Sequence, residues 1–166
     1  MRKKVCFPVM LVVLSVLFSS CNNNNYEKDL PAILGVKDVE FGEKTNFKEF
    51  CCFNGDGTVF ESYELSEKTI LDFENKIKSS NRISYLGQNL EWELTPMDSS
   101  SNSRISMVID YMSSNSKMDV RIKDVERLIK KDGVYYCILF HGEKDNVKFF
   151  VLDSDSKTLY AIDQQI

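Results

Sequence analysis

Apolar residues form strand-like runs in several segments of the chain. Segments 47–53 and 58–65 flank the sequence Asn54-Gly55-Asp56-Gly57, whose residues tolerate positive φ, and together they predict a β-hairpin. Further strands are expected at 90–94, 105–112, 134–140, 147–152 and 158–162. The last two of these are separated by a turn-forming sequence, and with 134–140 they predict an antiparallel meander.

One segment has the helical period instead. Its apolar residues are spaced three and four apart, so they fall on one face of a helix: Ile70, Phe73 and Ile77. Ser66 precedes them as an N-cap, with Leu65 placed for a hydrophobic staple to Ile70. The helix should end near residues 79–81.

Residues 119–131 fit two structures. Val125, Leu128 and Ile129 suit a short helix, whereas Lys131-Asp132-Gly133 before the strand 134–140 suits a hairpin with glycine at a bulge. We favour the hairpin. The expected fold is α+β: an antiparallel sheet of about six or seven strands with one or two helices packed on one face.

The three C-terminal strands are expected at the centre of this sheet, because they are apolar on both faces. The residues expected to pack under the Phe73 helix are Tyr136, Ile138, Phe149, Val151, Tyr160 and Ile162.

The first twenty residues are typical of a secretory signal peptide. Arg2, Lys3 and Lys4 precede an apolar run over residues 5–18, which is shorter than the roughly 20 residues that a membrane-spanning helix needs. The run ends in Phe18-Ser19-Ser20-Cys21, which resembles the lipobox of bacterial lipoproteins. The resemblance implies cleavage before Cys21 and attachment of the chain to the membrane through a lipid on this cysteine.

The chain is expected to divide into a signal peptide at 1–20, a lipidated tether at 21–30 and one globular α+β domain at 31–166. The tether is assigned because the residues after Cys21 are strongly polar. Asn22 stands where some lipoproteins have the aspartate that retains them in the inner membrane. The resemblance therefore implies a location in the bacterial cell envelope, at the outer membrane.

Charge excludes one class of partner. The signal peptide removes three of the 21 basic residues and none of the 25 acidic ones, so the mature chain is more acidic than the full sequence, whose net charge is −4. The basic residues of the segment 121–131 are interleaved with acidic ones and form no stripe for a phosphate backbone. Nucleic acid is therefore not an expected partner.

Three cysteines remain in the mature domain besides Cys21. Either Cys51 or Cys52 could form a disulfide with Cys137, but not both, because successive residues of a strand point to opposite faces. The alternative is that all three are small buried hydrophobic residues. No Cys-x-x-Cys spacing supports redox chemistry or a zinc site.

Residues that could carry catalysis are few. His141 is the only histidine, and no nucleophile motif accompanies it. Glu91 and Glu93 share one face of an expected strand and could form a carboxylate pair. A metal site would have to use Asn54 with Asp56 or Asp153 with Asp155, and both of these pairs lie in turns, where Asp and Asn are expected for backbone reasons. We expect no enzyme activity, no metal and no cofactor.

Two stretches carry a second, looser resemblance. The turn 54–57 followed by a strand and a helix, and the ending with Tyr135, Tyr136 and Tyr160, resemble small uncharacterised bacterial lipoproteins. That family implies a fold and a location but no activity. The expected function is a lipid-anchored envelope module that binds a protein or envelope partner, for example a toxin-immunity protein; the alternatives are an envelope hydrolase and a structural accessory subunit.

Overall fold

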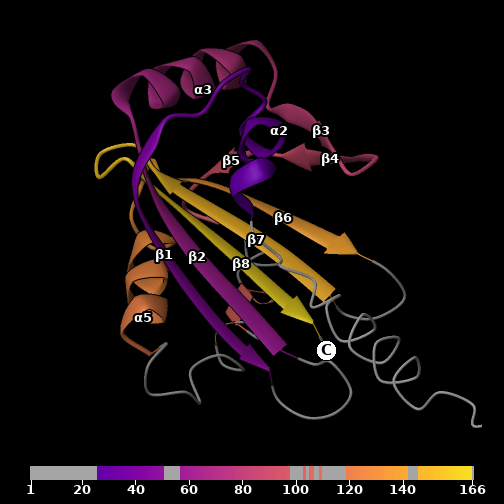
Figure 1. Cartoon of the computed structure of the whole chain (residues 1–166), viewed down its shortest axis with the longest axis vertical. Helices are drawn as coiled ribbons and strands as arrows, with labels where there is room; N and C mark the ends of the chain where they lie inside the picture. Colours follow the sequence, from indigo (N-terminus) through magenta and orange to yellow (C-terminus); the bar gives the residue numbers. More distant parts are fainter. Residues whose placement is uncertain are drawn as a thin grey trace, which may run out of the picture.

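The computed structural model describes residues 26–50, 57–97, 103, 105–106, 109, 119–141 and 146–165 (Figure 1). Within these residues an antiparallel main sheet has the strand order β1-β2-β8-β7-β6-β5, and β3 pairs with β4 in a second, small sheet. The strands are β1 Phe41–Phe50, β2 Gly57–Leu65, β3 Arg82–Tyr85, β4 Gln88–Glu91, β5 Glu93–Leu94, β6 Tyr135–His141, β7 Asn146–Asp153 and β8 Thr158–Gln165. The helices are η1 Tyr26–Lys28, α2 Leu30–Leu34, α3 Glu67–Ser79 and α5 Asp119–Leu128.

The predicted α+β fold is confirmed. β1 and β2 pair as the predicted hairpin, with Phe47 opposite Phe60, although most of its turn lies outside the described residues. β6, β7 and β8 form the predicted meander, and β7 and β8 lie at the centre of the sheet. Helix α3 begins at the predicted cap, where the Ser66 side chain accepts a hydrogen bond from the backbone N–H of Thr69 at 3.2 Å.

Different elements cover the two faces of the main sheet. Face A carries Cys137, Phe150 and Ala161, which are buried in one cluster with residues of α2, α3 and the small sheet. Face B is the opposite face, where residues of the same strands are buried in a second cluster with α5. In Figure 1, α3 lies across one end of the sheet and α5 lies beside β1. The two longer helices therefore divide between the two faces rather than sharing one.

The residues predicted to lie under α3 pack on face B instead. Tyr136, Phe149, Val151 and Ile162 are buried in the cluster that contains α5, with Ile138 and Tyr160 packed against it. Side chains alternate between the faces of a strand, so a shift of one residue moves the whole set to the other face. The prediction had the correct strands and the wrong face.

Two regions that were predicted as strands are helical at their described residues. Residues 119–131, for which we favoured a hairpin, contain α5, and its buried residues Ile122, Val125 and Leu128 have helical spacing. In the predicted strand 105–112, the described positions 105, 106 and 109 are helical, and Ile105 and Ile109 are buried on face B. The other residues of that segment lie outside the described ones.

The segment 82–94 contains more strands than predicted. β3 was not expected, and the expected strand 90–94 is divided between β4 in the small sheet and β5 in the main sheet. Trp92 lies at the division, where it is buried and its indole N–H donates to the carbonyl oxygen of Ile33 at 3.1 Å. This bond ties α2 to the division between the two sheets.

The predicted tether 21–30 is wrong for its last residues. Tyr26 is only 3% exposed and Leu30 is fully buried, both in the face A cluster, so these residues belong to the folded domain. Residues 22–25 lie outside the described part of the chain. Among the described helices, none is long and apolar enough to cross a membrane.

Candidate functional site

A set of buried polar side chains fastens the N-terminal segment to face A. We call Tyr26, Glu61, Tyr63, Lys148 and Asp163 the Tyr26 clasp. The carboxylate of Glu61 is 0% exposed and accepts hydrogen bonds from the Tyr26 backbone N–H at 3.0 Å and from the Tyr63 hydroxyl. Asn46, beside the clasp on β1, donates to the other Glu61 oxygen at 2.8 Å. Both oxygens of this buried anion are thus hydrogen-bonded.

The other half of the clasp is an ion pair. The Lys148 ammonium lies 2.7 Å from Asp163 and donates to the Tyr26 hydroxyl at 2.8 Å, while that hydroxyl donates to Asp163 at 2.9 Å. Burial, followed by the nearby negative charge of Asp163, raises the pKa of Tyr26. Lys148 pairs with Asp163, and Lys44 on β1 lies 3.9 Å from Glu61, so each carboxylate of the clasp has a cation beside it. The clasp therefore acts as a structural fastening of the N-terminal segment.

A groove with unmatched acidic groups lies where β1, β2 and α3 meet. We call it the acidic groove; its volume is about 590 Å³. Its charged lining consists of Glu40, Glu43, Glu64, Glu67 and Lys157. Lys157 is within 3.7 Å of Glu67, whereas the other three carboxylates have no ion-pair or hydrogen-bond partner in the described part of the chain. The groove therefore carries an excess of negative charge.

Local backbone structure shapes this groove. β1 and β2 are in register at Phe41 with Leu65 and at Lys44 with Tyr63, so two residues of β1 stand opposite Glu64 alone, which is a β-bulge. Beyond the bulge, the Thr69 hydroxyl donates to the carbonyl oxygen of Glu40 at 3.2 Å and so holds the start of β1 against α3. The bulge and this bond hold the glutamates around one hollow.

Signals for this groove in the sequence were weak. Glu40 and Glu43 both lie before residue 47, where the first strand was predicted to start, whereas β1 begins at Phe41. Glu64 is the last residue but one of the next predicted strand, 58–65. The antiparallel pairing of β1 with β2 brings them together. Only the acidic composition of the chain indicated that an acidic site could form.

Glu91 and Glu93, the candidate carboxylate pair, do not lie on one strand. Glu91 lies in the small sheet and pairs with Arg82 at 3.2 Å, whereas Glu93 lies in the main sheet and accepts from the Tyr136 hydroxyl. The candidate pair is thus divided between two sheets.

Asp153 and Asp155 are held by Lys131, at 3.0 and 2.7 Å. Burial alone would raise the pKa of Asp153, but hydrogen bonds from Ser156 and Lys131 lower it below its ordinary value. No group of metal-binding side chains occurs among the described residues.

The remaining candidate residues fall in different places. Cys137 is fully buried on face A, and this burial raises the pKa of its thiol. Cys51 and Cys52 lie outside the described residues, as do Cys21, Asn54 and Asp56, so the disulfide stays a prediction. His141 is the last residue of β6. Trp92 and Tyr136 are buried, so with Tyr135 they form no exposed aromatic face.

Comparison of the chain with protein-family models, with curated proteins and with solved structures gives no match. The resemblance to small lipoproteins stays an expectation from the sequence. Arguments about function therefore rest on the geometry described above.

Proposed function

We propose that the chain is a lipid-anchored protein of the bacterial envelope that binds a basic protein partner in the acidic groove. The observation that carries this proposal is the set of three carboxylates, Glu40, Glu43 and Glu64, that line one groove and form no ion pair within the described residues. An immunity protein against a basic toxin is one form of such a function.

The charge of the groove favours a partner with exposed lysine or arginine side chains. Complementary charge accelerates the encounter and suppresses partners of the wrong sign. Phe41 and Leu65 also line the groove, so that the aliphatic part of a lysine or arginine can pack against apolar surface. The volume of about 590 Å³ admits one or two such side chains.

The groove can be tested with a defined basic probe. A fluorescent pentalysine peptide should bind the purified protein at low salt, and the double variant Glu40→Gln/Glu64→Gln should weaken binding by about tenfold because it removes two groove charges. The matched control is Glu126→Gln/Asp132→Asn, which removes the same charge beside α5. Fluorescence anisotropy over a salt series gives the dissociation constants.

The control decides between two explanations. If both double variants weaken binding equally, net charge rather than the groove attracts the peptide, and the proposed site is wrong. Absence of pentalysine binding at low salt would also contradict it.

Lipidation is tested separately. Replacement of Cys21 with serine should abolish labelling by radioactive palmitate and move the protein out of the membrane fraction, because this cysteine is the expected acylation site. Cell fractionation and fatty-acid labelling measure both effects. A wild-type protein that takes up no fatty acid and fractionates as soluble would contradict the anchor and leave the groove proposal standing.

A further inference from the structure

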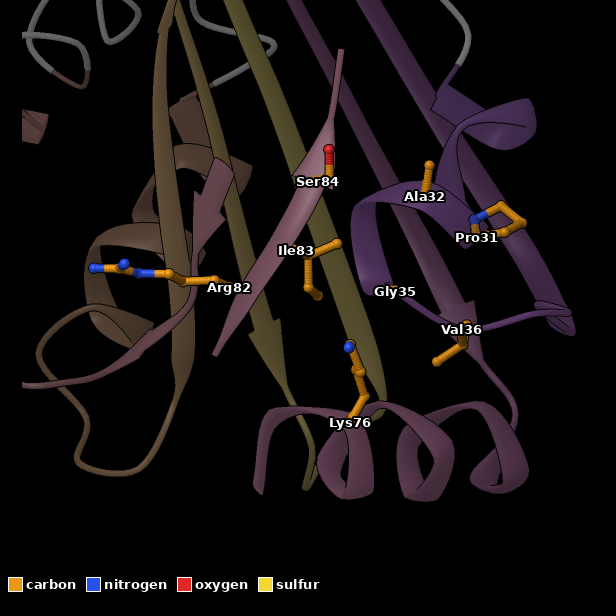
Figure 2. A pocket seen from close by; sticks show the side chains of 8 residues that line it. All are labelled: Pro31, Ala32, Gly35, Val36, Lys76, Arg82, Ile83 and Ser84. Carbon is orange, nitrogen blue, oxygen red and sulfur yellow. The ribbon is translucent and has the colours of Figure 1, made fainter. Parts of the chain in front are cut away.

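A second hollow lies between α2, β3 and one residue of α3 (Figure 2). We call it the Lys76 pocket; its volume is about 360 Å³. Four of its lining residues are apolar, Pro31, Ala32, Val36 and Ile83, and they lie beside Lys76, Arg82 and Ser84. Ligand sites commonly combine apolar walls of this kind with a few polar groups, and volumes of about 300 to 1,000 Å³ are typical.

Lys76 is the exception among the half-buried lysines. Within the described residues, Lys44, Lys148 and Lys157 each form an ion pair with a carboxylate. Lys76 is also half-buried, yet no described carboxylate pairs with it and none lines the pocket. Figure 2 shows the Lys76 side chain extending away from α3, toward Ile83 and Val36.

Arg82, the second cationic side chain that lines the pocket, already forms an ion pair. The Arg82 guanidinium is held by Glu91 at 3.2 Å, and in Figure 2 it points away from Lys76. A single ammonium suits a singly charged carboxylate, whereas a phosphate group is better matched by several donors or by the fork of an arginine. The pocket therefore favours a carboxylate over a phosphate.

The walls of the pocket are fixed before any ligand binds. Gly35 has a φ of +64°, and a Cβ atom there would lie 2.9 Å from Cδ1 of Ile83, so α2 and β3 approach closely because residue 35 is glycine. The hydroxyl of Tyr85 donates to Asp29 at 3.0 Å and ties the small sheet to the start of α2. A preformed pocket loses little entropy on binding.

We propose that the Lys76 pocket binds a carboxylate attached to a small aliphatic group, such as the free C-terminus of a peptide that ends in alanine or valine. The carboxylate pairs with the Lys76 ammonium, and the aliphatic group lies against Val36 and Ile83. This site is separate from the acidic groove and takes a ligand of opposite charge, so the two proposals can fail independently.

The test uses N-acetyl-alanyl-valine with a free carboxylate and the same dipeptide with an amidated end. In two-dimensional ¹H–¹⁵N NMR, the free acid should shift the amide signals of Gly35, Val36 and Ile83, and the amide should not. Lys76→Met should raise the dissociation constant by about tenfold or more, whereas Lys76→Arg, which keeps the charge, should retain binding. Lys78→Met is the matched control, because Lys78 is an exposed lysine of the same helix outside the pocket.

Several results would overturn the proposal. They are equal binding of the acid and the amide, unchanged binding by Lys76→Met, or signal shifts confined to other parts of the protein. Inorganic phosphate that competes as well as the dipeptide would show a general anion site and contradict the carboxylate assignment. Away from the pocket, the ¹H–¹⁵N spectrum of Lys76→Met should match that of the wild type, which verifies that this variant is folded.

Discussion

Replacing Phe73 with alanine should lower the free energy of unfolding by about 3 to 5 kcal/mol, which is a large share of the roughly 5 to 15 kcal/mol that stabilises a domain. Phe73 is 0% exposed, and its ring meets the rings of Trp92 and Tyr135 edge to face, with centroids 5.0 and 5.1 Å away. Truncation leaves a cavity where α3, β6 and the segment between the two sheets meet. Urea denaturation followed by tryptophan fluorescence measures the change.

Leu71 supplies the matched control. It lies on the same helix but is 53% exposed, so Leu71→Ala should change the free energy of unfolding by less than about 0.5 kcal/mol. If the two variants unfold at the same urea concentration, α3 does not pack through Phe73 and the description of the face A cluster is wrong.

Glu61→Ala should also destabilise the protein by about 3 to 5 kcal/mol. The substitution removes the acceptor of three hydrogen bonds, from the backbone N–H of Tyr26, the hydroxyl of Tyr63 and the side chain of Asn46. Each buried donor left without a partner costs about 1 to 3 kcal/mol. The N-terminal segment should then detach more readily, and limited proteolysis should cut near Tyr26 faster than in the wild type.

The neighbouring glutamate of the same strand is the control for this variant. Glu64 is exposed in the acidic groove, so the free energy of unfolding of Glu64→Ala should lie within about 0.5 kcal/mol of the wild-type value. Equal stability of Glu61→Ala and the wild type would show that the clasp does not fasten the N-terminal segment. Faster proteolysis in both variants would instead point to a general loosening of β2.

Local patterns predicted the elements whose signals are contained in a few neighbouring residues. Helix α3 was found because its cap, its staple and its apolar spacing agree, and the β1–β2 hairpin was found because turn residues separate two strand-like runs. The meander of β6, β7 and β8 was found for the same reason. In these segments local preference and tertiary packing favour the same structure.

Predictions failed where local preference was divided or where long-range contacts decide. The segment of α5 combines helical apolar spacing with the turn sequence before Gly133, and the turn residues were given too much weight. Tyr26 is surrounded by polar residues and is buried only because Glu61 and Asp163, far along the chain, accept its hydrogen bonds. No pattern confined to residues 22–30 contains that information.

Neither hollow could have been located from the sequence. The acidic groove takes its charged residues from the start of β1, the end of β2 and the turn before β8, and a β-bulge, which has no reliable signal here, shapes it. The Lys76 pocket depends on β3, which was not predicted. The acidic composition of the chain indicated that a protein partner would be basic, but it did not indicate where either hollow lies.

The Tyr26 clasp also determines how the fold resists mechanical force. A pull that acts on Tyr26 is carried by its bonds to Glu61 on β2, Asp163 on β8 and Lys148 on β7. These three adjacent strands lie inside the sheet, where each has neighbours on both sides. The load is thus spread over several strands at once, and no edge strand is peeled away one hydrogen bond at a time.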